Sequence, residues 1–402
     1  MRRLNIAGKY SIRHKAAYKS ALKHALTELS MGRGLRFKDK RYKKSLRFVN
    51  VESVGPVRGC GLCYVRLVYL LFRKHDIIVA QPCTLQRCVN VLDWFNRRIT
   101  NMFPGQGKEK SSQVKDYESA KDVVKALFNY VRFGAGERLV AHCDSSAGLY
   151  FTWDKMRKWS AWHFMLSLGT RTCSYCNAGD VFSLLLNSML PGTPEIVADI
   201  GDTRRSPFDH FWGYSDYPCL GLSLFNLVPA CTRCNTNMKG AKKQDIYQVI
   251  HPYLDSFDDG VRFYAVFERY AAISCLKERD VCVVIWPTLG MNSCRDVEKR
   301  AGASAKFFHL DEVYNQTYRR ELLDTIRRVV SMPSAYWEDL KCRFPGIDEL
   351  CLNRMLLSCS IDRSSINTER LSKLTCDLWD QLHVDTLPEE FVCGINVHNG
   401  GY

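Results

Sequence analysis

Two pairs of cysteines are the first residues whose spacing indicates chemistry. Each pair follows the pattern CxxC: Cys173 with Cys176, and Cys231 with Cys234. Two thiolates that lie two residues apart can bind one ion, and four thiolates match the tetrahedral coordination that Zn²⁺ prefers. A site with four protein ligands has no open position for a substrate. The spacing therefore predicts a structural Zn²⁺ ion, against the simpler alternative of four reduced cysteines with unrelated roles.

The stretch around these pairs carries further polar residues in a fixed order. It contains CSYCN at 173–177, FDHFWGYSDYP at 208–218, LSLFNLVPACTRCN at 222–235, a Lys-Gly pair at 239–240 and HPYLDSF at 251–257. This order resembles the HNH endonucleases of the ββα-metal fold, and most closely a branch found in bacterial anti-phage defence systems. The resemblance covers about residues 165–260, with a weaker echo in FHLDEVYN at 308–315.

The resemblance implies a role for five residues. In that fold the Asp-His pair ends a strand and the CxxCN segment begins a helix beside it. Asp209 and Asn235 are therefore expected to hold one Mg²⁺ or Mn²⁺ ion through oxygen ligands. His210 is expected to take a proton from the attacking water, because an unperturbed histidine is partly neutral at pH 7. Asn226 is expected to brace the loop and orient His210, and Lys239, one helical turn after Asn235, to contact a phosphate.

Simpler interpretations of the same residues exist. An Asp-His pair by itself more often belongs to a loop, and an asparagine before Leu-Val-Pro is a common turn residue. A helical lysine such as Lys239 is commonly solvated. The order of these residues inside the double cysteine motif favours the nuclease. Gly213 and Gly221 depart from the family pattern and imply a looser loop after His210.

Positive charge is concentrated at the beginning of the chain. The 402 residues carry a formal net charge of +15, and residues 1–50 contain 15 Lys and Arg with only Glu28 and Asp39 against them. A basic run at 36–48 with interleaved aromatic residues can follow a phosphate backbone while its rings stack. The residues expected to contact nucleic acid there are Lys38, Lys40, Arg41, Lys43 and Lys44. The alternative is a solvated or subunit-contacting arm.

Hydrophobic periodicity predicts helices at 15–29, 114–133 and 153–169, strand material at 262–286 and mostly helical structure at 296–385. The apolar face of the helix at 15–29 offers a second interpretation of the basic region, in which this helix docks onto the core or a partner protein. Residues 56–103 hold short apolar segments and a second cysteine set, Cys60, Cys63, Cys83 and Cys88. Its last pair lies too far apart for a standard knuckle, so a second zinc site stays open.

Several protein classes are excluded by composition. No apolar run approaches the 18 residues that a membrane span needs, and no secretory signal is visible. The cysteine content is below that of a disulfide scaffold, which favours reduced thiols and a cytoplasmic protein with no membrane association.

The predicted fold is therefore α+β, with a zinc-stapled ββα-metal core flanked by mostly helical segments. Four regions are expected: a basic arm with one helix (1–55), a helical or mixed region (56–152), the nuclease core (153–260), and a strand pair followed by helices (261–402). The predicted function is Mg²⁺-dependent hydrolysis of phosphodiester bonds, with double-stranded DNA as substrate. The family resemblance adds anti-phage defence and an ATPase partner protein. The alternatives are a non-catalytic zinc-stapled nucleic-acid-binding protein and an RNase that uses the same site.

Overall fold

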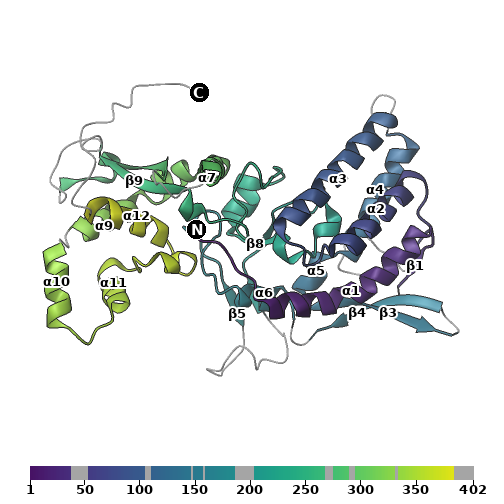
Figure 1. Ribbon diagram of the computed structural model, residues 1–402, viewed down its shortest axis with the longest axis horizontal. Helices are drawn as coiled ribbons and strands as arrows, with labels where there is room; N and C mark the ends of the chain where they lie inside the picture. Colours follow the sequence, from purple (N-terminus) through teal and green to yellow (C-terminus); the bar gives the residue numbers. More distant parts are fainter. Residues whose placement is uncertain are drawn as a thin grey trace.

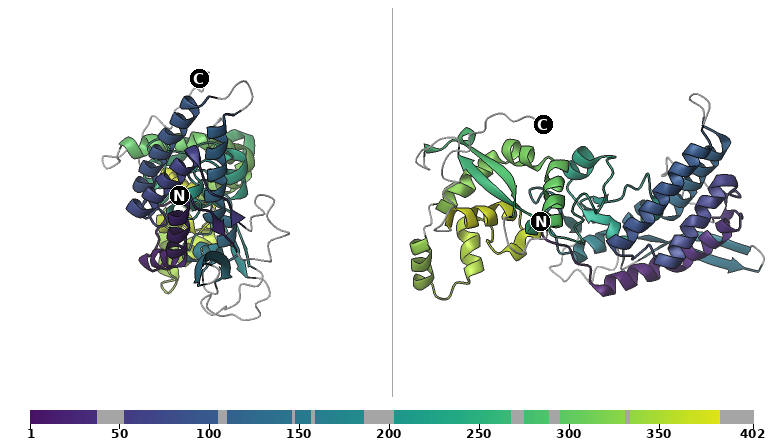
Figure 2. Two further views of the ribbon diagram at one scale, coloured as in Figure 1. Left: turned by 90° about the vertical axis from the view of Figure 1, so that its right-hand side faces the viewer. Right: turned by 45° about the horizontal axis from the view of Figure 1, so that its top comes forward.

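The computed structural model describes residues 1–37, 53–104, 110–145, 148–156, 159–185, 203–267, 275–288, 295–330 and 334–383. The molecule is elongated (Figures 1 and 2), with residues 8–156 at one end, residues 261–383 at the other, and the segment 159–260 between them. Small antiparallel sheets are distributed among the helices, each of two strands. The α+β class predicted from the sequence is confirmed.

Four long helices build the first end of the molecule. They are α1 (Gly8–Ser30), α2 (Gly59–His75), α3 (Pro82–Met102) and α4 (Ser112–Leu127). Helix α2 packs against α1, α3 and α4. Between residues 56 and 103, where the sequence indicates only short apolar segments, the structure forms two helices of 17 and 21 residues.

Helix α1 is part of the core. Its apolar residues recur every three or four positions, and Tyr18, Leu22 and Leu26 are fully or almost fully buried. On its polar side, Lys15 and Lys19 pair with one oxygen of Asp76 at 2.7 and 2.8 Å. Residues 8–30 are therefore docked on the core, as the alternative interpretation of this helix expects. The five basic residues between Lys38 and Lys44 that the sequence assigns to nucleic acid lie outside the described residues.

A β-hairpin that was not predicted from the sequence lies beside α1. Strands β3 (Glu137–Asp144) and β4 (Gly148–Lys155) pair antiparallel, and the short pair β1 (Leu35–Arg36) and β2 (Ser53–Val54) lies next to it. The helix predicted at 153–169 is wrong in its first part, because residues 153–155 belong to β4. Helix α6 (Ala161–Ser167) begins only after Ser160, whose hydroxyl accepts a hydrogen bond from the N–H of His163.

The helix predicted at 114–133 is divided in two. After α4 ends, the side-chain oxygen of Asn129 accepts hydrogen bonds from the N–H groups of Val131 and Arg132. This cap starts the short helix α5 (Tyr130–Gly134) in a new direction.

The described residues of the central segment form two small sheets and one π-helix. Strands β5 (Ser183–Leu185) and β6 (Thr203–Arg205) form one sheet, and β7 (Phe208–His210) and β8 (Leu227–Pro229) form the other. Two short 3₁₀-helices, η2 (Pro218–Leu220) and η3 (Leu224–Asn226), lie between β7 and β8 in the chain. A third, η5 (Phe257–Asp259), follows later. The π-helix η4 (Arg233–Lys239) follows β8 directly.

The second end of the molecule combines one hairpin with a group of helices. The predicted strand material at 262–286 is confirmed as the antiparallel pair β9 (Val261–Phe267) and β10 (Val281–Pro287). The predicted helical region follows as α7 (Arg295–Phe307), α8 (Leu310–Glu312), η8 (Val313–Thr317), α9 (Arg319–Val330), α10 (Ser334–Arg343), α11 (Glu349–Leu357), η9 (Arg363–Asn367) and α12 (Ser372–His383).

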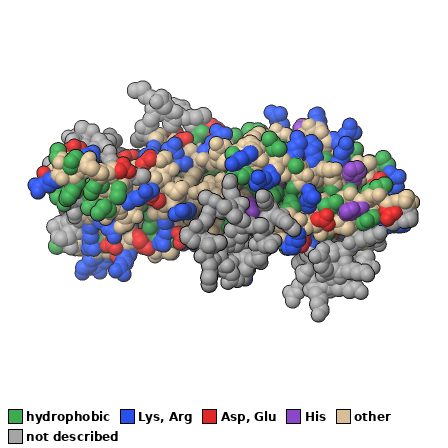
Figure 3. All heavy atoms as spheres, turned by 90° about the horizontal axis from the view of Figure 1, so that it is seen from below, with side chains coloured by type: hydrophobic (Ala, Val, Ile, Leu, Met, Phe, Trp, Pro, Cys, Tyr) green, Lys and Arg blue, Asp and Glu red, His purple; other side chains and the backbone are tan. Residues whose placement is uncertain are grey.

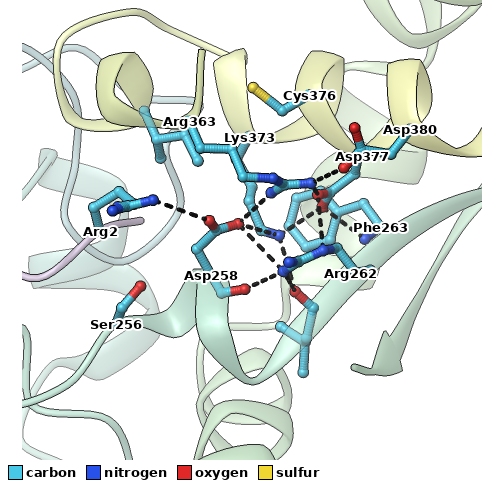
Figure 4. A network of polar contacts seen from close by, with 12 residues as sticks. Arg2, Ser256, Asp258, Arg262, Phe263, Arg363, Lys373, Cys376, Asp377 and Asp380 are labelled. Atoms are coloured by element: carbon cyan, nitrogen blue, oxygen red, sulfur yellow. Dashed lines mark hydrogen bonds and ion pairs between the residues drawn. The ribbon is translucent and has the colours of Figure 1, made fainter. Parts of the chain in front are cut away.

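A buried network of charges fastens α12 to the central segment (Figure 4). The ammonium group of Lys373 lies 2.7 Å from Asp258 and 2.6 Å from Asp377, and its side chain is 0% exposed. Arg363 bridges the same two carboxylates at 2.7 and 2.8 Å. Arg262 also contacts both carboxylates, at 3.5 and 3.6 Å. The two buried aspartates are thus compensated by three cations, as the burial of ionised groups requires.

The first residues of the chain lie against segments that are distant in sequence. The N–H of Leu4 donates to the carbonyl of Pro252 at 2.7 Å, and the N–H of Asp258 donates to the carbonyl of Met1 at 3.2 Å. The backbone of Arg2 exchanges two hydrogen bonds with the side chain of Asn367, at 2.9 and 3.0 Å. Residues 1–4 therefore join the central segment to the C-terminal helices.

The buried apolar residues form one cluster from Met1 to Leu378, which passes through all three parts of the molecule. Lys and Arg side chains spread along the face seen from below, with Asp and Glu side chains among them (Figure 3). None of the helices in the described ranges has the length and apolar character that would let it cross a membrane.

Candidate metal centre and the adjoining pocket

Four buried cysteines meet beneath η4. The sulfur atoms of Cys173, Cys176, Cys231 and Cys234 all lie within 4.8 Å of one another. Tetrahedral Zn²⁺ with Zn–S bonds of about 2.3 Å requires sulfur separations of about 3.8 Å, and the sulfurs of Cys176 and Cys231 are 3.9 Å apart. The cluster has the donor type, number and spacing that a structural Zn²⁺ ion needs.

The backbone around the cluster brings the sulfurs together. The N–H of Cys173 donates to the carbonyl of Gly179, and a Cβ atom at Gly179 would lie 2.6 Å from the Cβ of Cys231. Only glycine allows the two knuckles to approach this closely. Burial raises the pKa of the Cys173 thiol well above its ordinary value, so the ionised cluster requires a compensating cation.

Residues from the C-terminal helices complete the surroundings of the first knuckle. The hydroxyls of Tyr314 and Tyr318 donate to the carbonyls of Cys176 and Ala178 at 2.7 and 3.1 Å. Tyr314 lies within FHLDEVYN at 308–315, the segment with the weaker resemblance to the family pattern. The sequence therefore contained an indication that this segment belongs with the first knuckle.

Asn177 makes a second connection from the same knuckle. It adopts a left-handed backbone conformation with φ 53°, and its buried amide oxygen accepts from the N–H of Lys373 at 2.9 Å. The asparagine at the end of CSYCN therefore fixes α12 next to the cysteines, a role that the sequence did not reveal.

Asp209 and Lys239 form a buried ion pair above the cysteine cluster. The ammonium group of Lys239 lies 2.7 and 2.8 Å from the two carboxylate oxygens of Asp209, and it also donates to the carbonyl of His210. The hydroxyl of Tyr175 donates to the same carboxylate at 2.6 Å. Burial lowers the pKa of Lys239, while the Asp209 carboxylate acts in the opposite direction. Asp209 is thus neutralised by a side chain of its own protein.

His210 is oriented by its ring contacts. Its Nε2 lies 3.2 Å from the carbonyl of Gly221, and the ring packs between Tyr130 and Tyr214. Because a carbonyl only accepts, Nε2 carries the proton in this contact and Nδ1 is left as the basic nitrogen. Burial lowers the pKa of His210 to about 4, while the Gly221 carbonyl opposes this shift. The imidazole is therefore neutral at pH 7.

Asn226 acts on the backbone next to His210. Its side-chain oxygen accepts from the N–H of Trp212 at 2.8 Å, and its amide donates to the carbonyls of Trp212 and Leu220 at 3.2 and 3.1 Å. These bonds fasten both ends of the loop 212–220. The direct partner of the His210 ring is the carbonyl of Gly221, one residue beyond that loop.

One pocket brings the remaining candidate residues together. It has a volume of about 270 Å³, and its lining includes Asp209, His210, Asn235 and Lys239. The side chain of Asn235 is partly exposed and makes no hydrogen bond to the described residues. Lys242 and Lys243 also belong to its lining. The four residues that the sequence assigned to water activation, metal and phosphate thus line one pocket, with the ammonium of Lys239 in contact with Asp209.

The pocket offers oxygen ligands that a hard cation prefers, from the carboxylate of Asp209 and the side-chain amide of Asn235. Lys239, however, occupies both carboxylate oxygens. A divalent ion on Asp209 therefore requires that Lys239 move away.

The second set of cysteines is arranged differently from the first. Cys60 and Cys63 lie on α2, Cys83 and Cys88 on α3, and two of the four are exposed. Among the described residues they do not form a group whose sulfurs could share an ion.

Comparison with known proteins adds one partial similarity. Protein ea31 of Escherichia phage lambda is 41% identical to this chain over 59 residues, which is 14% of this chain and 19% of that protein. The chain therefore matches about a fifth of the length of this relative. No protein-family model matches the chain, and no solved structure matches it.

Proposed function

We propose that this protein is a metal-dependent endonuclease of the HNH type that hydrolyses phosphodiester bonds in DNA. The observation that carries the proposal is the pocket in which Asp209, His210 and Asn235 meet at the end of β7 and the start of η4. The order of strand, strand and helix, stapled by four cysteines, supports a ββα-metal core.

Four residues of the pocket have distinct roles in the proposed hydrolysis. Asp209 and Asn235 would hold Mg²⁺, which supplies charge stabilisation on the scissile phosphate. Nδ1 of His210 takes the proton of the attacking water, since Nε2 is held at Gly221. Lys239, released from Asp209, would remain in the pocket as a positive charge for the phosphate.

The test is cleavage of supercoiled plasmid. Wild-type protein with Mg²⁺ is expected to nick or linearise the plasmid, and EDTA to prevent cleavage. His210→Ala should lower the rate by roughly 10²- to 10⁴-fold, as the loss of a general base does. His24→Ala, in an exposed histidine of α1, is the matched control and should cut normally. Undiminished cleavage by His210→Ala contradicts the assigned role.

The ion pair between Lys239 and Asp209 favours one alternative, a non-catalytic zinc-stapled nucleic-acid-binding protein. A site whose carboxylate is already neutralised has less affinity for a divalent ion. Binding of DNA without cleavage at any Mg²⁺ or Mn²⁺ concentration would support this alternative. Cleavage of RNA but not of DNA would identify an RNase.

The resemblance to the defence branch extends the proposal to protection of bacteria against phages, together with an ATPase partner. Cells that produce the wild-type protein with that partner should resist phage infection, and cells with His210→Ala should not. Equal plating of phage on the two strains contradicts the defence role.

A further inference from the structure

The outer face of α3 is an exposed stripe of basic and aromatic residues. Arg87, Val91, Trp94 and Arg98 follow one another at intervals of three and four residues, so they lie on one side of the helix. Trp94 is 57% exposed and Val91 40%. The remaining exposed positions of this face are Asn90, Arg97, Asn101 and Met102. The stripe contains no acidic residue.

The arginines of this face have no carboxylate partner among the described residues, unlike three buried or partly buried arginines elsewhere in the protein. Arg132, Arg300 and Arg363 pair with carboxylates at distances of 2.6 to 2.8 Å. Within the described ranges, no carboxylate pairs with Arg87, Arg97 or Arg98. Arg98 instead lies over the ring of Trp94, 5.8 Å from its centroid. The face therefore presents three uncompensated positive charges and one aromatic surface.

The inner side of α3 is fixed to the wall of the pocket. Asp93 accepts hydrogen bonds from the hydroxyl of Tyr217 at 2.8 Å and from Lys243 at 3.4 Å, and Lys243 lines the pocket. Gln86 accepts from the indole N–H of Trp212 at 3.0 Å. Helix α3 is thus joined to the pocket lining through Lys243, and it runs outward from the central segment (Figure 1).

We infer that this face of α3 binds the phosphate backbone of duplex DNA whose scissile bond lies in the pocket. The inference rests on the proposed nuclease function. From Arg87 to Arg98 the helix rises about 16 Å, which corresponds to about five base-pair steps of a duplex at an axial rise of ~3.4 Å each. Trp94 contributes an apolar contact beside the backbone. An acidic protein partner would also match the charge, but the connection to the pocket through Lys243 favours the substrate of that pocket.

The experiment measures the affinity for one duplex at several salt concentrations, in EDTA so that the DNA stays intact. The triple variant Arg87→Gln, Arg97→Gln and Arg98→Gln removes the charge of the face and leaves its buried side unchanged. The control replaces three exposed arginines at the opposite end of the molecule by glutamine, Arg279, Arg320 and Arg343, the first and last of which pair with Asp280 and Asp339. Circular dichroism checks that both variants fold.

The triple variant is expected to bind more weakly and to have a shallower salt dependence, with the slope reduced by about 0.9 for each phosphate that the variant no longer neutralises. Trp94→Ala should weaken binding without a change of slope, because the ring carries no charge. The control should behave like the wild type. A slope equal to the wild-type value in a folded triple variant overturns the inference, and loss of self-association in that variant would then assign the face to a protein contact.

Cleavage by the wild-type protein decides the proposed function separately. If the wild type cuts plasmid but the triple variant keeps its slope, only the inference fails. If the slope falls but no variant or wild-type protein cuts, the face binds DNA and the nuclease proposal fails.

Discussion

At the scale of single residues, the side chain of Lys239 contacts a different group from the one predicted from the sequence. The sequence expects it to point at a substrate phosphate, one helical turn after Asn235. In the structure its ammonium group lies between both oxygens of Asp209 and the carbonyl of His210. A protein cation thus lies where the proposed function needs a divalent ion.

The first prediction follows from this competition. Lys239→Met should bind Mn²⁺ at least ~10-fold more tightly than the wild type, because the ion no longer displaces an ammonium group. Without metal the variant should be less stable by roughly 3–5 kcal/mol, since it leaves the buried Asp209 carboxylate unpaired. Calorimetric titration with Mn²⁺ and thermal unfolding with and without the ion measure both effects.

Lys243→Met is the control, because Lys243 lines the same pocket but its side chain is 56% exposed and does not contact Asp209. Equal Mn²⁺ affinity of Lys239→Met and wild type would show that Lys239 does not compete for the site.

At the scale of elements, the two cysteine knuckles hold the hairpin β7–β8 and the π-helix η4 together. The helix has only seven residues and an unusual hydrogen-bond pattern, so its own stability is low. Its position depends on Cys231, which precedes it, and on Cys234 in its first turn.

Removal of one ligand should therefore affect the fold. Purified protein should contain one tightly bound zinc per chain, and Cys231→Ser should lose this zinc and several kcal/mol of stability, because the binding of structural zinc contributes directly to folding. Cys63→Ser, in an exposed cysteine of α2, should keep both. Metal analysis and chemical denaturation test this. Zinc-free wild-type protein with an unchanged unfolding transition would contradict a structural zinc site.

The same elements show what the sequence could predict. The cysteine cluster follows from the spacing within each pair, and the helix that begins within CxxCN follows from the motif. The ion pair of Lys239 with Asp209 does not, because the motif assigns Lys239 to a substrate phosphate and no spacing pattern relates it to a carboxylate. The β3–β4 hairpin was missed because WDKMRKW at 153–159 has helical spacing, whereas Phe151 and Trp153 alternate toward the core as in a strand.

At the scale of the whole molecule, the network around Lys373 is one of several contacts that attach the C-terminal helices to the centre. Lys373→Met should destabilise the protein by roughly 3–5 kcal/mol, because it leaves Asp258 and Asp377 buried with less compensation. Chemical denaturation measures the loss. Lys299→Met, in an exposed lysine of α7, is the matched control. A loss below about 1 kcal/mol would show that Arg262 and Arg363 compensate both carboxylates without Lys373.

The position of the first four residues has a consequence for how the protein is made. Met1 and Leu4 are synthesised long before their partners at 252–258, and Arg2 still longer before its partner Asn367. Contacts between residues so far apart in sequence form slowly, because a long loop must close first. Helices α1 to α4 can assemble during synthesis, whereas residues 1–4 wait until residues 252–258 and Asn367 have been translated. A chain interrupted before Asn367 would therefore leave residues 1–4 without these partners.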